Sequence, residues 1–276
     1  MSDIETADPS ATTTDTTPKP VRYRAVVRDL APLDTYAWIR RGFFDLMAAP
    51  FISYFFGVAF CAMAWMLALL FTKYPEYTMS GISGCLLVGP FMAIGLYEVS
   101  RRKQENLPQD LGLALTCWES HIGSMGLLLL VLMVLELLWG RASLVVFAVF
   151  FNTGMPTTTA VLDAVFNPQN WEFVLAYLCV GGIFAGLVFA FMAVSIPMIL
   201  DRDLDAITAA LTSAKLVFSN PGVMLLWGAV IVFMMTLAFL PYGIGIIAVG
   251  PWLGHATWHA YKHSISWEEV PAEELR

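Results

Sequence analysis

Residues 204–231 read LDAITAALTSAKLVFSNPGVMLLWGAVI, and this stretch joins two kinds of helix. Its first half has two opposed faces at helical spacing: Ile207, Leu211, Ala214 and Phe218 on one, and Thr208, Thr212, Lys215 and Ser219 on the other. Such a segment is too polar to cross a bilayer and is typical of a helix that lies along the membrane interface. The second half, from Pro221, is continuously apolar and predicts a membrane-spanning helix.

The same organisation occurs three times along the chain. An aspartate that suits a helix N-cap begins each amphipathic stretch, and a second residue follows at one shared interval near the next span: Asp34 with Pro50, Asp110 with Gly126, and Asp205 with Pro221. All three copies enter the membrane from the same side, so the repeats are parallel rather than inverted. We predict an all-α polytopic membrane protein with repeats at about 33–103, 110–203 and 204–263. Each repeat is an amphipathic interfacial helix followed by a transmembrane hairpin.

Composition supports a lipid environment. Of the 276 residues 58% are hydrophobic and 13% charged, and the mean hydropathy is +0.68, values that a soluble domain of this size would not carry. Runs long enough to span a bilayer predict six transmembrane helices: Phe51–Phe71, Gly81–Tyr97, Ile122–Trp139, Phe173–Ile199, Val223–Leu240 and Gly243–Trp258. The outer segment 140–172 contains a further apolar stretch, Leu144–Phe151, which either extends the third helix or forms a separate element.

The basic residues predict the orientation. Nearly all lie before the first span, in the second-to-third and fourth-to-fifth connections, or in the tail, and only Lys73 and Arg141 fall in the opposite loops. Lys and Arg mark the cytoplasmic side, so we expect a multi-pass protein of the bacterial inner (cytoplasmic) membrane with both termini cytoplasmic. Residues 1–32 are predicted to be a disordered tail, 33–263 the transmembrane domain and 264–276 an acidic tail. The basic residues are few and beside the membrane, which argues against nucleic acid as a partner.

Three segments resemble a known family. They are WIRRGFFDLMAAP (38–50), SGCLLVGPFMAIGLYEVSRRKQENL (83–107) and the stretch 204–231, and they are similar to the bacterial integral-membrane family catalogued as domain of unknown function 2189. The likeness runs from about Leu33 to His263. The resemblance implies no established activity and no catalytic residues. Some members carry a cytochrome c oxidase label, which leaves open an accessory role beside a respiratory complex.

The oxidase label can be tested against the histidines. Haem-copper catalysis needs several histidines on different helices. This chain has four, at His121, His255, His259 and His263, and the last three lie on one helix. The oxidase core is therefore not in this chain.

A candidate polar cluster is predicted at the cytoplasmic face. The second spans echo one another in GPFMAIGLYEVSRRK (89–103), FMAVSIPMILDRD (191–203) and GPWLGHATWHAYKHS (250–264), which places Glu98, Met198 and His259 at one depth. We assign Glu98, Arg102, His255 and His259 to the candidate cluster. Glu98 stands three and four residues before Arg101 and Arg102, so it is interpreted first as a salt bridge at the helix end and second as a partner of His259.

The histidine face allows two interpretations. His255, His259 and His263 recur every fourth residue, and imidazoles at that spacing can bind a metal ion. The favoured alternative is an interfacial belt, because Trp258, Tyr261, Lys262 and Trp267 surround them. A second intramembrane charge, Glu136, is interpreted as a structural pair with Arg141.

Enzyme motifs are absent from the sequence, and the four cysteines are scattered without close pairs. We therefore expect no enzyme and no cofactor. The favoured hypothesis is a non-catalytic scaffold, accessory subunit or envelope-homeostasis factor that acts through partners, with the lipid bilayer and other membrane proteins as the partners. The alternatives are a small-solute or lipid transporter or channel, and a metal-binding membrane protein that uses the face of His255, His259 and His263.

Overall fold

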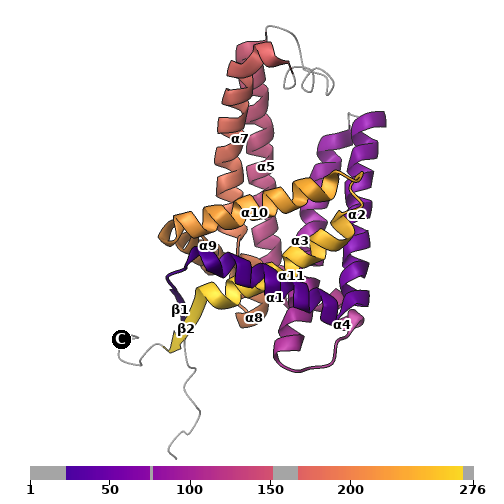
Figure 1. Ribbon diagram of the computed structural model, residues 1–276. Helices are drawn as coiled ribbons and strands as arrows, with labels where there is room; N and C mark the ends of the chain where they lie inside the picture. Colours follow the sequence, from indigo (N-terminus) through magenta and orange to yellow (C-terminus); the bar gives the residue numbers. More distant parts are fainter. Residues whose placement is uncertain (1–22, 75–76, 152–166, 270–276) are drawn as a thin grey trace, which may run out of the picture.

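The computed structural model describes residues 23–74, 77–151 and 167–269 and is mostly helical (Figure 1). Its elements in chain order are β1 (Tyr23–Val27), α1 (Pro32–Ala48), α2 (Pro50–Lys73), α3 (Thr78–Gln104), α4 (Leu111–Thr116), η2 (Glu119–His121), α5 (Ile122–Phe150), η3 (Pro168–Asn170), α7 (Trp171–Met192), α8 (Ser195–Arg202), α9 (Ala206–Ser219), α10 (Pro221–Phe239), α11 (Ile246–Ser264) and β2 (Ile265–Glu269).

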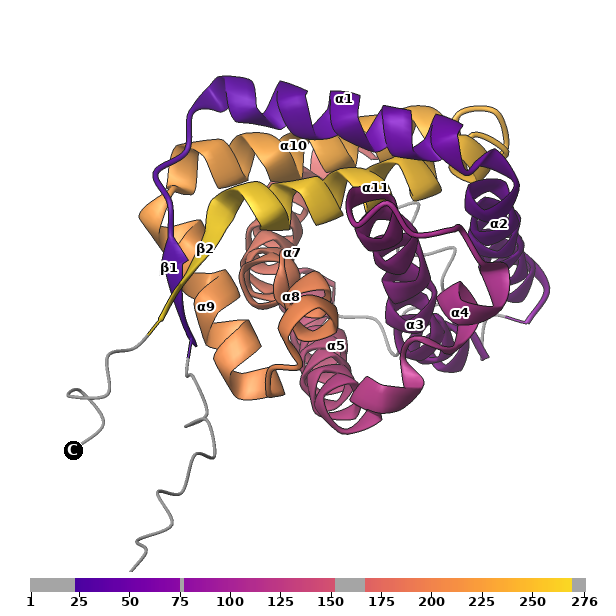
Figure 2. The same cartoon turned by 90° about the horizontal axis from the view of Figure 1, so that it is seen from below.

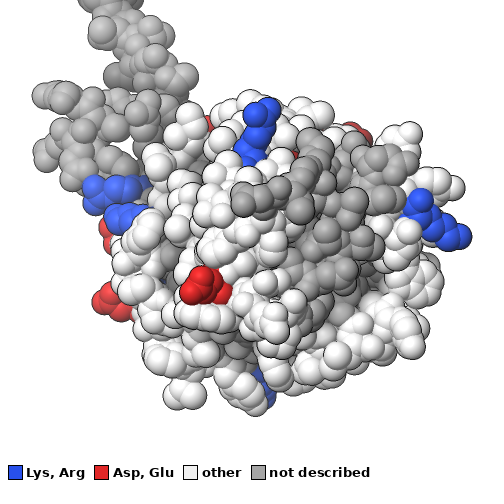
Figure 3. Space-filling view, turned by 90° about the horizontal axis from the view of Figure 1, so that it is seen from above, with Lys and Arg blue, Asp and Glu red and all other residues white. Residues whose placement is uncertain are grey.

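Two long hairpins, α2–α3 and α5–α7, stand side by side and rise to the same end of the molecule (Figure 1). We call the opposite end, where α3 ends and α5 begins, the elbow side, because the short helices α4 and α8 lie there. Figure 3 looks down on the hairpin tips and shows few charged side chains on that face. The α3 helix, by contrast, ends in three basic residues at the elbow side: Arg101, Arg102 and Lys103.

A layer of three helices crosses the hairpins. Figure 2 shows α1, α11 and α10 running beside one another, with α11 in contact with α1, α2 and α3. Small residues allow the close approach: a Cβ added to Gly42 of α1 would lie 2.6 Å from the backbone N of Ala256, and one added to Gly57 of α2 would lie 2.0 Å from the carbonyl O of Ile247. The core therefore sits where α11 meets its neighbours.

Five helical segments are long and apolar enough to cross a membrane: Pro50–Lys73, Gly81–Gln104, Leu111–Phe150, Pro168–Arg202 and Pro221–Phe239. The sixth predicted span, Gly243–Trp258, is not confirmed. Most of it lies in α11, which begins at Ile246 and in which ten of the 19 residues are buried by protein. Hydropathy along the chain does not reveal what covers a helix, and α11 is covered by other helices.

The turn between α10 and α11 is tied to α2. The Trp65 indole Nε1 donates to the carbonyl O of Tyr242 at 2.8 Å, and the Cys61 thiol lies 3.5 Å from the carbonyl O of Gly243. Trp65 stands roughly 22 Å along α2 from Pro50, at about 1.5 Å per residue. Hydrocarbon offers no hydrogen-bond partner at such a depth, so these side chains supply the hydrogen-bond donors for the carbonyl groups of the irregular turn.

Several predicted boundaries are corrected. The predicted disordered tail 1–32 contains β1, which pairs antiparallel with β2 from the predicted acidic tail, in register from Tyr23↔Glu269 to Val27↔Ile265. β-Branched and aromatic residues on both segments favour this pairing. The apolar stretch Leu144–Phe151 extends the third helix, since α5 continues to Phe150. Residues 1–22, 152–166 and 270–276, which complete the two tails and the outer segment, lie outside the described residues.

Two of the three predicted N-caps are confirmed. The Asp110 carboxylate accepts from the backbone N of Leu113 at 3.0 Å, and the Asp205 carboxylate from that of Thr208 at 2.9 Å. The prediction for Asp34 is wrong, because α1 already begins at Pro32 and places Asp34 inside its first turn. There the Asp34 carboxylate accepts from the backbone N of Ala31 at 2.7 Å.

The close contact between α2 and α11 can be tested by substitution. Gly57→Ala places a Cβ against the Ile247 carbonyl and is expected to lower stability by at least about 1–3 kcal/mol, as overpacking does. Gly84→Ala is the matched control, because nothing lies within 4 Å of a Cβ there. Thermal unfolding of the purified protein in detergent, followed by tryptophan fluorescence, should show a lower midpoint for Gly57→Ala alone. Equal midpoints would contradict the packing described.

Candidate functional site

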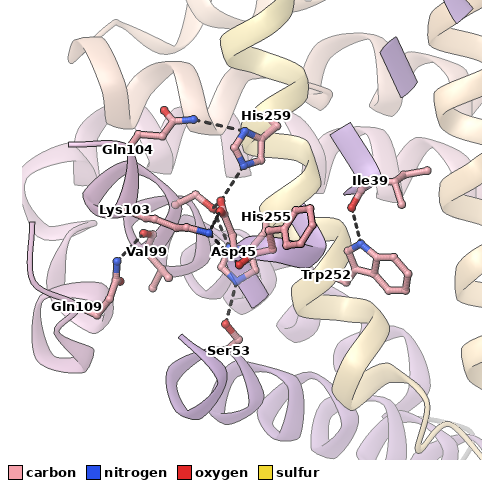
Figure 4. A network of polar contacts seen from close by, with 12 residues as sticks. Ile39, Asp45, Ser53, Val99, Lys103, Gln104, Gln109, Trp252, His255 and His259 are labelled. Atoms are coloured by element: carbon pink, nitrogen blue, oxygen red, sulfur yellow. Dashed lines mark hydrogen bonds and ion pairs between the residues drawn. The ribbon is translucent and has the colours of Figure 1, made fainter. Parts of the chain in front are cut away.

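The most connected polar group in the core is the carboxylate of Asp45, on the buried face of α1 (Figure 4). Its Oδ2 accepts from Ser100 Oγ on α3 at 2.7 Å and from His259 Nε2 on α11 at 2.7 Å. Its Oδ1 lies 2.8 Å from Lys103 Nζ, which also donates to the carbonyl O of Phe44 at 2.8 Å. One carboxylate thus joins three helices.

The network continues to α2 through His255, which is completely buried. His255 Nδ1 lies 2.8 Å from Ser100 Oγ, and its Nε2 lies 2.9 Å from Ser53 Oγ. Because the Ser100 hydroxyl hydrogen points to Asp45, His255 Nδ1 must donate to Ser100, and Ser53 then donates to Nε2. We name Asp45, Ser53, Ser100, Lys103, His255 and His259 the Asp45 network.

The electrostatics of the network favour an ionised carboxylate. Burial by itself raises the pKa of Asp45, but the contacts with His259, Lys103 and Ser100 outweigh burial and hold it at about 2. The pKa is lower in the folded than in the unfolded chain. The stabilisation is therefore complete above about pH 4 and is lost as the pH falls through the folded value.

The connectivity resembles a serine–histidine–aspartate relay, yet the geometry closes it to a substrate. Ser53, Ser100 and His255 are each 0% exposed. None of the network residues lines the elbow-side region or any of three apolar cavities that lie among the described residues. A nucleophile needs space for the reacting group, so the network acts as a clamp between helices.

The predicted metal set is not brought to one point. His255 and His259 join the Asp45 network, whereas His263 Nδ1 accepts from Trp38 Nε1 at 3.1 Å and lies 3.9 Å from Asp34 Oδ1. Within residues 23–74, 77–151 and 167–269 no group of three His, Cys, Asp or Glu side chains is placed to hold a metal ion. Steps of four residues rotate by about 40° on a helix, which turns His263 away from His255.

The interfacial belt is also corrected. Trp258 and Tyr261 are 0% exposed and lie in the core. The Tyr261 hydroxyl donates to Asp201 Oδ2 on α8 at 2.6 Å, and Lys262 Nζ lies 3.2 Å from the same oxygen. Tyr261 and Lys262 hold α8 against α11, and the rings of Trp258 and Tyr261 are covered by protein.

Glu98 and Arg102 are separated from the two histidines. The predicted salt bridges of Glu98 are confirmed, with Arg101 Nη2 at 2.7 Å and Arg102 Nη1 at 3.6 Å. The predicted cluster with His259 is wrong. Residues two apart on a helix lie about 200° from each other, so Glu98 and Ser100 face opposite sides of α3.

Glu98 and Arg102 instead line a polar cavity of about 700 Å³ at the elbow side. Its walls come from the end of α3, from α4 and η2, and from the end of α8. We call it the elbow-side cavity. Its polar lining residues are Glu98, Arg101, Arg102, Thr116, Cys117, Ser120, His121, Asp201, Arg202 and Asp203.

Three guanidinium groups and three carboxylates line this cavity, and of the carboxylates Asp203 is exposed whereas Glu98 and Asp201 are buried. Glu98 is 2% exposed and faces two guanidinium groups. Its Oε2 and the Arg101 Nε are buried without an aligned hydrogen bond, although Oε2 lies 2.7 Å from the other end of the Arg101 guanidinium. Asp201 likewise lies near two cations, with Arg202 Nε at 3.6 Å in addition to Lys262. Each buried carboxylate is thus outnumbered by its cations.

The family model described as "Predicted integral membrane protein (DUF2189)" matches residues 77–201, which run from the start of α3 to α8. Residues 77–201 are thus similar to the DUF2189 family. This range contains Glu98, Arg101 and Arg102, and it is narrower than the resemblance that the sequence suggested from Leu33 to His263. No curated protein and no solved structure matches the chain.

The chain is thus an integral membrane protein, and the segment that the DUF2189 model matches forms most of the elbow-side cavity. The helices α1, α2 and α11 bring Asp45, Ser53 and the histidines of the Asp45 network from outside that segment. Sequence reasoning missed Asp45, Ser53, Ser100 and Lys103. One signal for Asp45 was present: it shares a helical face with Trp38, Gly42 and Leu46, which are all buried. A lone charge on a buried face predicts a buried partner.

Removing the central carboxylate tests the clamp. Asp45→Ala leaves His259 and Lys103 without their acceptor and is expected to cost about 3–5 kcal/mol of unfolding free energy, as for a broken buried pair. Thermal unfolding in detergent measures the loss, and Asp29→Ala, at an exposed aspartate just before α1, is the control. The double variant Asp45→Ala/His259→Ala should lose less unfolding free energy than the sum of the losses in the two single variants. Full additivity would show that the two groups do not depend on each other.

Proposed function

We propose that this protein is a non-catalytic binding protein of the bacterial inner membrane, in the class of scaffolds and accessory subunits, and that its elbow-side cavity binds a phosphate-bearing group. The observation that carries the proposal is the contrast between its two polar regions. The Asp45 network resembles a catalytic relay but is closed, whereas the elbow-side cavity is open, roomy and lined by guanidinium groups.

Phosphate is the favoured chemistry because of the donors in the wall. Arg101, Arg102 and Arg202 present planar guanidinium groups, which match phosphate oxygens in two-point hydrogen bonds. Arg202 is held in place by the aromatic rings of Tyr23 and Trp267, with its Cζ 5.5 Å and 5.2 Å from their centres. Arg101 Nε is a donor without an acceptor. A phosphate in the cavity would supply that acceptor.

The alternative of a transporter finds less support. A conduit would join the polar cavity to the spaces between the hairpins, but the elbow-side cavity shares no lining residue with three apolar cavities among the described residues, the one beside Glu136 included. The metal-binding alternative is weaker still, because His263 faces Trp38. An accessory role beside another membrane protein, including a respiratory complex, fits the large apolar outer surfaces of the hairpins, and it leaves catalysis to the partner.

The proposed orientation places the elbow side in the cytoplasm. The basic ends of α3 and α11 lie there, and the opposite hairpin tips carry few charges (Figure 3). The repeat of elbow helix and hairpin is proposed as well: α1, α4 and α9 each precede a hairpin in the element order. The third hairpin, α10–α11, differs from the other two, because it crosses them instead of standing beside them (Figure 1).

Reporter fusions test the orientation. A green fluorescent protein fused to the C-terminus should fluoresce, because it folds in the cytoplasm, and alkaline phosphatase at the same position should be inactive. The same reporters inserted after Lys73, at the tip of the α2–α3 hairpin, should give the reverse result. Active alkaline phosphatase at the C-terminus would overturn the orientation.

Native mass spectrometry in detergent tests the ligand. The probes are phosphatidylglycerol, glycerol 3-phosphate as a soluble phosphate, and diacylglycerol without phosphate. We expect a phosphate compound to bind and diacylglycerol not to bind at the same concentration. Arg101→Gln should weaken that binding about tenfold, since a hydrogen bond to a charged group contributes about 1.5–3 kcal/mol.

Arg141→Gln is the matched control, because Arg141 is exposed and lies outside the cavity. Binding of phosphatidylglycerol alone identifies a lipid headgroup, and binding of both phosphate compounds identifies the free group. Equal binding of diacylglycerol, or equal effects of the two substitutions, would refute the proposal.

A further inference from the structure

A second polar group faces an apolar space between the two long hairpins. Glu136 lies on α5, and its Oε2 accepts from Ser83 Oγ on α3 at 3.3 Å. Its other oxygen, Oε1, is buried and has no hydrogen-bond partner among the described residues. The predicted pair with Arg141 is wrong, because five residues turn a helix by about 140° and Arg141 is exposed on another face.

The space beside Glu136 is a cavity of about 400 Å³. Its walls come from α3, α5 and α7, and Glu136 is the only charged side chain among its lining residues. We call it the hairpin cavity. The volume is within the usual range for a small-molecule site, about 300–1,000 Å³.

One wall of the hairpin cavity is aromatic. Trp139 and Phe184 both line it, with ring centres 5.8 Å apart, and the ring centre of Tyr177 lies 5.2 Å from that of Trp139. A cation beside such ring faces is attracted by their quadrupoles. The same aromatic wall can also pack against the hydrocarbon part of a ligand.

The depth of Glu136 decides how a ligand would arrive. It stands roughly 21 Å along α5 from Ile122, at about 1.5 Å per residue, which falls inside a hydrocarbon core of about 30 Å. All three walls belong to candidate spans. A ligand therefore enters from the bilayer and must be soluble in lipid.

These observations define the ligand's chemistry. An unpaired carboxylate in a low-dielectric site needs a hydrogen-bond donor, and a positive charge satisfies it best. The apolar walls favour a ligand whose remaining part is a hydrocarbon. We propose that the hairpin cavity binds a lipophilic amine, with the ammonium group on Glu136 Oε1 beside Trp139 and the hydrocarbon chain along α3 and α7.

This site is separate from the elbow-side cavity, and its test does not depend on the proposed function. The experiment compares dodecylamine with dodecanol, which has the same chain length without the charge. Binding to the protein in phosphatidylcholine nanodiscs is measured by native mass spectrometry. We expect dodecylamine to bind at least tenfold more tightly than dodecanol.

Three variants locate the interaction. Glu136→Gln keeps the shape and can keep the Ser83 contact, and it should abolish the preference for the amine. Ala185→Phe fills the cavity from α7 and should weaken both compounds. Glu172→Gln, in the first turn of α7 and outside the cavity, should bind like the parent protein.

Equal binding of dodecylamine and dodecanol to the parent protein would overturn the proposal. A loss of the amine preference in Glu172→Gln as large as in Glu136→Gln would also overturn it, because the effect would then come from charge in general. Unfolding midpoints within the error of the parent value for Glu136→Gln confirm that any loss is local.

Discussion

The carboxylate of Asp45 is the constraint on which the helix packing depends. It is 4% exposed, and a charge removed from water must be surrounded by donors. Those donors come from α3 and α11, and Ser100 passes the connection through His255 to Ser53 on α2. For these atoms to meet, α11 has to lie directly against α1 and α2. The small residues at Gly42 and Gly57 permit that approach, and a helix enclosed in this way has little surface left for lipid.

The sequence predicted what depends on order along the chain. Apolar length marked the two hairpins and α10, and an aspartate before an amphipathic stretch marked the starts of α4 and α9. It did not predict what depends on contacts across the fold. The histidines of α11 were visible as a face, but Asp45 is more than two hundred positions away from them, and only the fold brings the two together. Likewise, nothing local to the sequence shows that β1 of one tail pairs with β2 of the other.

The failure of the predicted cluster has the same physical origin. Matching Glu98 to His259 by depth in the membrane was reasonable, but depth does not specify direction around a helix. Glu98 and Ser100 differ by two residues and face opposite sides of α3. One side of α3 meets α1 and α11 through the Asp45 network, and the other lines the elbow-side cavity. Matching by depth therefore identified the correct end of the helices. It also assigned Glu98 and His259 to one cluster, although they lie on opposite sides of α3.

The helix α3 therefore separates two groups of polar residues, one on each of its sides. Lys103 and Ser100 hold it to α1 and α11, whereas Glu98 and Ser83 face the α5–α7 hairpin and α8 at two different depths. Both the hairpin cavity and the elbow-side cavity lie along this second side. On the first side every polar atom of the Asp45 network has a partner, and on the second side Glu98 and Glu136 each keep an oxygen without an aligned hydrogen bond. Buried polar groups are nearly always paired, but Trp258 Nε1 and Ser264 Oγ on α11 lack a partner as well. The missing partner of Glu136 therefore supports the proposed ligand only together with the cavity that lies beside it.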